Sequence, residues 1–262
     1  MKELMLMRTR GLSGPFVTGK AGLSAGKIGK SVGNYVSQYK QQIIDVAGAI
    51  PTAWLLPENI VHSSGNVSAW TNEANTAYAT GGSAYDLGLQ TGTPIVSTHN
   101  GLQVVDSDGT ANMQSAASQM ISQPVTAIMV AKTRDAGATT LVLLDGHTAT
   151  TFRILRHSSS IWRANAGAVL DVTATDTDVN IHAVMANGAS SIYKVYNTVE
   201  QTETGDIGAA GFDWLTILAS RTGGSNFDGW VGEVILFPVA MTDPQLNDIL
   251  VLLANKWNIG PS

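Results

Sequence analysis

Beyond about residue 51, short runs of β-branched and aliphatic residues alternate with clusters of Gly, Asn, Asp and Ser. Such runs are typical of strands, and such clusters are typical of turns. The clearest runs cover residues 125–132, 140–144, 178–185, 191–196, 214–219 and 230–237. Because no helical pattern separates them, the sequence predicts an all-β fold, an antiparallel β-sandwich or jelly roll.

Two amphipathic helices are expected on either side of these strands. Near the C-terminus, Thr242 and Gln245 form a Thr-x-x-Gln capping box, and Pro244 stands in the first turn. The apolar stripe of this C-terminal helix consists of Leu246, Ile249, Leu250, Leu253 and Trp257. An earlier stripe at three- and four-residue spacing consists of Val32, Tyr35, Val36, Tyr39, Ile43 and Val46. It predicts one helix of about four turns before Gly48.

Residues 11–33 have a different composition, with glycines interleaved among Lys, Ser and other small residues. A segment of this kind cannot bury enough apolar surface to fold alone. We therefore expect an anchor of residues 1–50, made of an extended Gly/Lys-rich arm and the first helix, followed by a folded domain of residues 51–262. The arm is expected to lie across a partner.

The charge distribution supports this division. The 262 residues carry a formal charge of −5. Residues 1–44 hold seven basic residues and one acidic residue, or +6, so the remainder carries −11. The chain has no Cys, which excludes thiolate zinc sites, Fe–S clusters and cysteine nucleophiles. The most apolar run, residues 231–241, is too short to span a membrane, and we expect no secretory signal.

Two enzyme motifs nearly occur in the arm. Residues 22–26 fit G-x-S-x-G, but no buried strand precedes Ser24. Residues 24–31 differ from a P-loop by one residue, because Ser24 stands where the first glycine belongs. No alternating β/α pattern follows that would supply the rest of a nucleotide site. We therefore interpret both as flexible, basic arm sequence.

Metal and cofactor sites are not predicted. The histidines, which are His62, His99, His147, His157 and His182, share no ligand spacing. Asp106-x-Asp108-Gly109 and Asp176-x-Asp178 resemble fragments of calcium loops but lack the remaining ligands. Turns are the expected role of both segments, and a loop calcium ion is the open alternative.

A family resemblance lies in the C-terminal third. Residues 227–237, with Asp228-Gly229 and Glu233, followed by residues 241–243 and by Lys256-Trp257, resemble the closing part of concanavalin A-like, or laminin G-like, jelly-roll domains. Residues 67–70 and 101–105 resemble the opening strands of such domains. The resemblance implies a jelly roll over about residues 54–259 and structural roles for its shared residues, which are Trp70, Asp228, Gly229, Glu233 and Trp257. Such domains serve as binding or packing modules in bacteriophage structural proteins and in large secreted bacterial proteins.

The resulting hypothesis is a non-enzymatic structural component of a phage-like virion, a capsid decoration or a tail- or fibre-associated protein. It would belong to a homo- or hetero-oligomeric assembly. Its partner-binding residues would be Arg8, Arg10, Lys20, Lys27, Lys30, Tyr35 and Tyr39. Nucleic acid is a less favoured partner, because Tyr35 and Tyr39 alone offer stacking.

The alternative is a carbohydrate-binding lectin or adhesin module, with Tyr85 and Trp162 as candidate sugar platforms. An aromatic residue in an alternating strand is more often part of the core, and that interpretation of both residues stays open here. Hydrolysis is not expected, because Glu233 has no carboxylate two or four residues away on its strand.

Overall fold

The protein is described from a computed structural model. It describes residues 28–73, 76–116, 120–135, 137, 140–146, 152–158, 160–174, 178–197 and 199–260, and for residues 28–36 the backbone only. The predicted arm residues Arg8, Arg10, Lys20 and Lys27 therefore lie outside the described residues, as do the side chains of Lys30 and Tyr35. The chain divides into two units, Met1–Gln38 and Tyr39–Ser262, and the second holds all the features discussed below.

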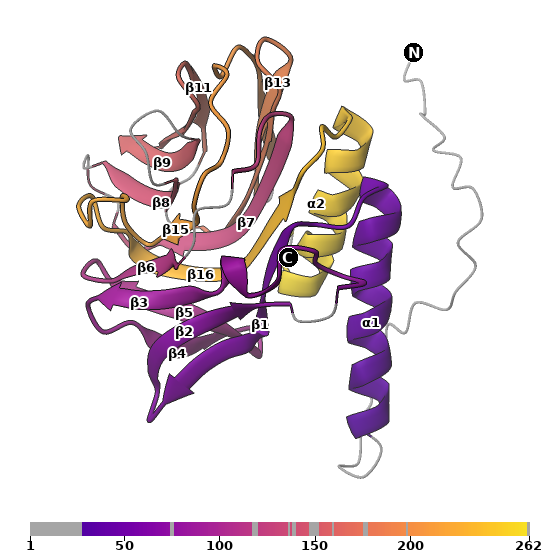
Figure 1. Cartoon of the computed structure of the whole chain (residues 1–262), viewed down its shortest axis with the longest axis vertical. Coiled ribbons are helices and arrows are strands. Elements are labelled where there is room, and N and C mark those ends of the chain that lie inside the picture. The colour runs from indigo at the N-terminus through magenta and orange to yellow at the C-terminus, as the bar shows by residue number, and fades with distance from the viewer. Residues whose placement is uncertain are drawn as a thin grey trace, which may run out of the picture. The chain divides into compact units, whose positions relative to one another are not determined.

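Strands dominate the second unit (Figure 1). They are β1 (Ala53–Ser63), β2 (Asn66–Asn72), β3 (Leu87–Thr91), β4 (Ile95–His99), β5 (Leu102–Asp108), β6 (Asn112–Ser115), β7 (Val125–Thr133), β8 (Leu141–Asp145), β9 (Arg153–Ser158), β10 (Ile161–Asn165), β11 (Val169–Thr173), β12 (Asn180–Ala186), β13 (Ser191–Tyr196), β14 (Glu200–Gly205), β15 (Thr216–Ile217) and β16 (Asp228–Phe237). The helices are α1 (Ile28–Ala47), the 3-10 helix η1 (Gly82–Tyr85) and α2 (Asp243–Trp257).

The strands pair in the order β11-β10-β9-β8-β15-β6-β3-β2-β4-β5-β16-β7-β12-β13-β14, and β1 joins β16 to β2. All the ladders between these strands are antiparallel. The two ends of this path meet, because β11 lies against β13 and β14. The sheet therefore folds over on itself around an inner core, the apolar cluster that includes Trp70, Met129, Trp162 and Phe212.

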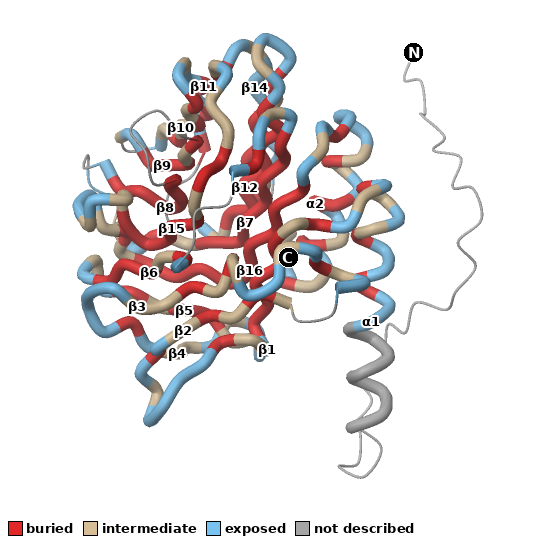
Figure 2. The backbone as a smooth tube through the Cα atoms, in the orientation of Figure 1, coloured by how far each residue is buried: buried red, intermediate tan, exposed pale blue. Residues whose placement is uncertain are grey.

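A second apolar cluster lies on the other face of the central strands. In β7, Met129 points to the inner core, whereas Ile128 and Val130 belong to this outer core. The outer core also includes Leu250 and Trp257 of α2 and Ile43 near the end of α1. Figure 2 shows the consequence, since β7, β12 and β16 are buried along most of their length. Both faces of these strands are covered, which explains their continuous apolar sequence.

Helix α2 begins and ends as its sequence predicts. The Thr242 side chain accepts a hydrogen bond from the backbone N–H of Gln245, and the Gln245 side chain accepts one from the backbone N–H of Thr242. Asn258 then takes a left-handed conformation and ends the helix. The Gln245 side chain also donates to the carbonyl oxygens of Val46 and Ala47, which tethers the end of α1.

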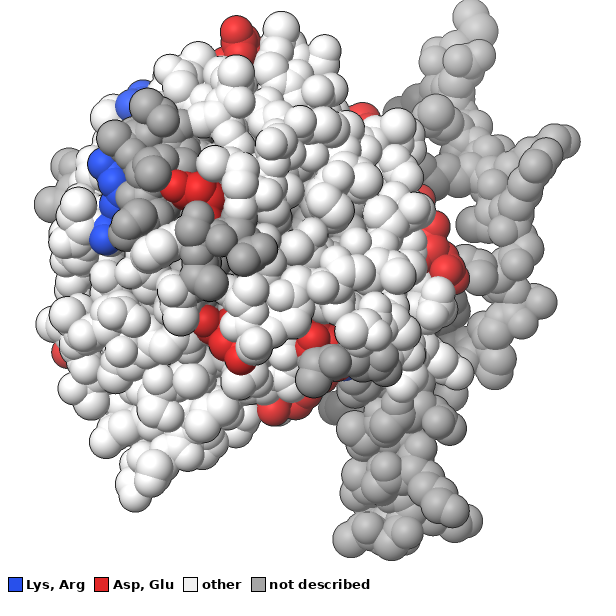
Figure 3. All heavy atoms as spheres, in the orientation of Figure 1, with Lys and Arg blue, Asp and Glu red and all other residues white. Residues whose placement is uncertain are grey.

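The all-β architecture and the C-terminal helix are confirmed, and the finer assignment to a concanavalin A-like jelly roll stays a prediction. The division into residues 1–50 and 51–262 stays a prediction. Residues 39–47 belong to the same compact unit as the strands, and Ile43 is fully buried there. No described helix is both long and apolar enough to cross a membrane. The face in Figure 3 is mostly uncharged, with Lys and Arg side chains gathered at one edge.

Candidate functional site

Strand pairing gathers charged side chains at one end of β5, β16 and β7. The register sets Trp230 of β16 between Asp106 of β5 and Lys132 of β7. Two residues along the strands, Asp228 stands opposite Asp108. Because side chains alternate between faces, Asp106, Asp228 and Trp230 lie on the same face of the sheet as the outer core.

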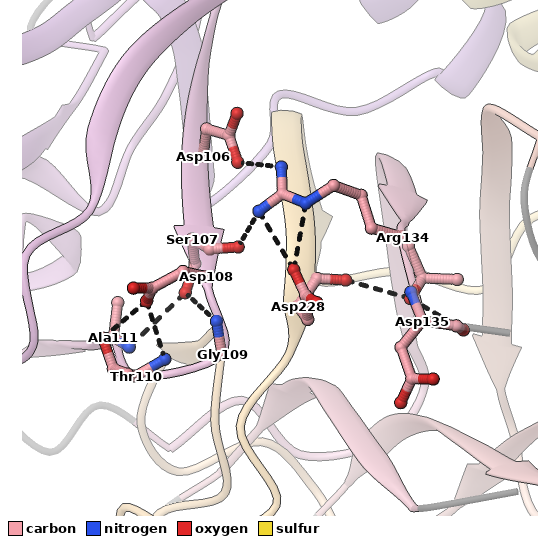
Figure 4. A network of polar contacts seen from close by, with 10 residues as sticks. Asp106, Ser107, Asp108, Gly109, Thr110, Ala111, Arg134, Asp135 and Asp228 are labelled. Carbon is pink, nitrogen blue, oxygen red and sulfur yellow. Dashed lines mark hydrogen bonds and ion pairs between the residues drawn. The ribbon is translucent and has the colours of Figure 1, made fainter. Parts of the chain in front are cut away.

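Arg134 links the carboxylates of this group (Figure 4). Its Nε donates to Asp228 Oδ1 at 3.0 Å, and its two terminal nitrogens donate to Asp106 and to the carbonyl oxygen of Ser107. Burial lowers the pKa of Arg134, but its hydrogen bonds and its attraction to Asp106 and Asp228 outweigh that effect and raise it. We call Asp106, Ser107, Asp108, Arg134 and Asp228 the Arg134 network.

The network is accessible from solvent. The side chains of Arg134, Asp228 and Asp106 are 43%, 37% and 16% exposed, respectively. Among the described residues, the second oxygen of each of the Asp106 and Asp228 carboxylates has no hydrogen-bond partner, and a carboxylate has about four lone-pair sites. The network can therefore accept hydrogen bonds from a ligand without being rearranged.

Tight turns hold the carboxylates of the network in place. Asp108 accepts hydrogen bonds from the hydroxyl and the backbone N–H of Thr110, and the hydroxyl bond is the main reason that its pKa is lowered. Between Asp228 and Trp230, Gly229 has φ +148, and a Cβ there would lie 2.0 Å from the Lys132 carbonyl oxygen. Only glycine allows strands β16 and β7 to approach this closely.

Aromatic rings adjoin the network. The His99 ring lies 4.8 Å from the ring of Trp230, and Trp230 stacks on Trp257 at 6.0 Å. Burial and the positive charge of Lys132 lower the pKa of His99, so its neutral form is favoured. Trp230 itself is 8% exposed, so His99 is the ring of this stack that faces solvent more fully.

A second carboxylate of β16 has an opposite environment. Glu233 is fully buried and accepts hydrogen bonds from Trp54 Nε1 at 2.8 Å and Trp257 Nε1 at 3.0 Å. Lys256 Nζ lies 2.8 Å away and the Tyr39 hydroxyl 3.2 Å away. This Glu233 hub joins β1, β16, α1 and α2, and its partners satisfy the buried charge.

Tyr39, which the sequence assigned to partner binding, contacts the body of its own chain. Its side chain is 5% exposed, and its hydroxyl group donates to Glu233. The described end of the stripe, Tyr39, Ile43 and Val46, packs against the body of the same chain, and the spacing of the stripe does not show this.

Tyr85 and Trp162 are buried, as expected for core residues, and neither ring is an exposed sugar platform. Trp162 is 1% exposed, and its ring lies 4.3 Å from His182 and 6.5 Å from Phe227 in the inner core. Tyr85 is 3% exposed, and burial raises its pKa to about 12. Both rings point inward because their strand or turn positions face the inner core. Trp70 is likewise buried, and its Nε1 donates to the Leu56 carbonyl oxygen.

The calcium-loop fragment at Asp106 has another role. Asp106 and Asp108 bind different partners, and the cation beside Asp106 is the Arg134 guanidinium. Asp176 of the second fragment lies outside the described residues. In the described part of the chain, no group of three or more His, Asp or Glu side chains is arranged to hold a metal ion.

The sequence alone missed Arg134, Lys132 and His99. None of them belongs to a short motif. Lys132 and Arg134 enter the site through the pairing of β7 with the distant strand β16, and His99 enters through the contact of its ring with Trp230 of that strand. The sequence does contain an Asp-Gly pair at the start of β16 and an Asp-x-Asp-Gly turn after β5. These two segments do not show that β16 pairs with β5, or in which register.

No protein-family model and no curated protein matches the sequence. Among solved structures, the chain resembles domain 4 of AbnA, a GH43 extracellular arabinanase from Geobacillus stearothermophilus, in complex with arabinotriose. That match has a TM-score of 0.54 at 13% identity and covers 77% of this chain and 98% of that one.

Two larger proteins are also similar. An arabinofuranosidase complexed with arabinofuranosyl-α-1,2-xylobiose gives a TM-score of 0.59 at 7% identity, over 82% of this chain and 64% of that one. Trypanosoma rangeli sialidase in complex with the inhibitor DANA gives 0.54 at 10% identity, over 88% of this chain and 40% of that one. The chain thus spans less than half of the sialidase, and these likenesses concern the fold.

Proposed function

We propose that the folded body is a carbohydrate-binding domain whose glycan contacts the Arg134 network. The observation that carries the proposal is the gathering of exposed, orientationally fixed carboxylates beside an aromatic stack at the end of β5, β16 and β7. The fold supports it, because an arabinanase domain solved with arabinotriose has this architecture along nearly its whole length.

The chemistry of the site suits sugar hydroxyl groups. Each free carboxylate oxygen of Asp106 and Asp228 accepts a hydrogen bond from a hydroxyl, and such charge-assisted bonds are the stronger kind. Arg134 holds both carboxylates in place, so a ligand does not have to order them on binding. The Trp230 ring, which is next to Asp106 in the strand register, and the His99 ring beyond it add an apolar surface on this face of the sheet.

Binding without hydrolysis is part of the proposal. A glycosidase pair needs one carboxylic acid that stays protonated and one free carboxylate. Here the Arg134 guanidinium lies between Asp106 and Asp228 and hydrogen-bonds with both, so a glycosidic bond cannot be placed between the two carboxyl groups as hydrolysis requires.

The anchoring of the arm in a virion stays a prediction. Its residues 1–27 lie outside the described residues, and the similar structures support the carbohydrate-binding alternative better. The separation of +6 in residues 1–44 from −11 in the remainder is still the reason to expect that the arm meets a partner that the body does not.

A glycan array with the full chain tests the proposed function, followed by titration of any bound glycan. We expect Arg134→Met and Asp228→Asn each to weaken binding by about tenfold or more, as loss of a charge-assisted hydrogen bond does. The matched control is Arg163→Met. Arg163 forms a comparable pair with Asp171, with both nitrogen–oxygen distances 2.7 Å, on β10 and β11.

An array without a bound glycan would overturn the proposed function. Equal weakening by Arg134→Met and Arg163→Met would overturn the location of the site.

A further inference from the structure

A groove lies near the other end of β16, away from the Arg134 network. It has a volume of about 440 Å³, within the range of small-molecule sites. Its lining includes the hydroxyl-bearing residues Thr52, Thr80, Tyr85 and Ser122 and the apolar residues Met120 and Pro238. Pro238 directly follows β16, whereas Asp228 begins it, so the ten-residue strand separates the two places by about 30 Å.

Tyr85 is the one buried residue among those that bring a hydroxyl group to this groove. The residue is 3% exposed, and burial accounts for its raised pKa. Its hydroxyl oxygen is nevertheless not among the described polar atoms that are sealed from solvent without a partner. Because Tyr85 lines the groove, we take the groove as the place where this oxygen meets solvent.

The ring of Tyr85 is held rigidly. A Cβ on Gly81 would lie 2.4 Å from the ring, so the Gly81 backbone already touches its face. The wall is also fixed, because the backbone N–H groups of Thr80 and Gly81 donate to the carbonyl oxygens of Pro51 and Thr52 at 2.9 and 2.8 Å. The Tyr85 side chain, which lines the groove, is therefore held in one position.

The lining determines the class of ligand. None of the described residues that line the groove carries a charge, so a charged ligand would lose its hydration without gaining an ion pair. Hydroxyl groups can donate and accept hydrogen bonds, and Met120, which is 64% exposed, adds an apolar surface at the rim. A ring with hydroxyl groups on its edge and C–H groups on its face matches this combination.

We propose that this groove binds a single neutral sugar ring, whose hydroxyl groups hydrogen-bond with the hydroxyl of Tyr85. This second site stands independently of the proposed function, because it shares no residue with the Arg134 network. It preserves a role for Tyr85 in sugar binding as a hydrogen-bonding group in place of an exposed stacking platform.

NMR titration of the full chain tests the second site, with D-glucose, D-galactose, D-xylose and L-arabinose as separate probes. We expect at least one probe to shift the backbone amide signals of Thr52, Thr80 and Ser122. Tyr85→Phe, which keeps the ring, should weaken that binding by about fivefold. Ser122→Trp, a change at an exposed position, should fill the groove and abolish the shifts.

Two control variants separate the sites. Arg134→Met should leave these shifts unchanged, and Tyr196→Phe is the matched tyrosine control on β13. Absence of shifts with all four sugars, or equal affinity in Tyr85→Phe and the natural chain, would overturn the second site. Neither result bears on the Arg134 network, whose own titration uses the glycan found by the array.

Discussion

Strand β16 carries two carboxylates whose surroundings give them different roles. Glu233 is fully buried beneath α1 and α2 and has four donors. Asp228 is 37% exposed and shares one guanidinium with Asp106. The residue type is nearly the same, so position relative to the helices decides whether a carboxylate stabilises the fold or is available to a ligand. Buried charges are costly to disturb, and exposed pairs are not.

The largest expected effect comes from Glu233→Gln. The substitution removes the charge that faces Lys256 and leaves that ammonium group, 11% exposed, without its carboxylate. Breaking a buried pair in this way costs about 3–5 kcal/mol of unfolding free energy. Urea unfolding measures it, with Asp171→Asn as the exposed control, expected to cost about 1 kcal/mol or less. A loss below 1 kcal/mol for Glu233→Gln would contradict the role of the hub.

The next effect concerns pH. His182 is fully buried beside Trp162 and Tyr193, and burial lowers its pKa to about 3. The unfolded chain takes up a proton near pH 6.5, so the folded state loses stability as pH falls from about 6.5 toward 3, by about 1.4 kcal/mol per pH unit. At pH 4.5 this amounts to about 2–3 kcal/mol relative to neutral pH.

His182→Phe checks this prediction. The difference in unfolding free energy between the natural chain and the variant, followed from pH 7 to pH 4.5, should change by that amount. Carboxylates titrate in both proteins and largely cancel in the comparison. A difference that is constant with pH would show that His182 does not titrate as a buried neutral group.

Tyr39→Phe should have a smaller effect. The variant removes one hydrogen bond of 3.2 Å to Glu233 and keeps the ring that packs against Trp54 at 6.1 Å. One such bond to a charged acceptor is worth about 1.5–3 kcal/mol, and the remaining donors of Glu233 place the loss near the lower value. Thermal or urea unfolding would record it. An unchanged stability would mean that α1 docks through its apolar residues alone.

The sequence specified the parts of the fold that depend on local pattern. Helix α2 begins at the predicted capping box, and the runs 125–132 and 230–237 are β7 and most of β16. Local pattern does not encode which strands pair. The Arg134 network required the registers of β5, β16 and β7, so Arg134 and Lys132 could not be found, although Asp106 and Asp228 were already noted for other reasons.

The sequence also could not show which aromatic residues are buried. Trp162 alternates with polar neighbours in β10, and the period of two shows that it lies on one face without showing which face is covered. In this fold the inner face holds it against His182 and Phe227. Likewise, the spacing of the stripe of α1 shows which face of the helix is apolar but not which surface that face packs against. Tyr39 was therefore assigned to binding of another protein and not to packing on the body.

Arg134→Met is expected to change stability least, and it tests most directly the contrast between Asp228 and Glu233. The Arg134 side chain is 43% exposed, so solvent screens its pairs with Asp106 and Asp228, and we expect a loss of about 1 kcal/mol or less. Raising the salt concentration should shrink that difference further. The same variant should weaken glycan binding by about tenfold, which is a large loss of binding for a small loss of stability. Glu233→Gln cannot give this combination, because its main effect is on stability. If urea unfolding instead gives a loss of 3 kcal/mol or more for Arg134→Met, the network is a structural clamp like the Glu233 hub, and exposure does not separate the two carboxylates of β16.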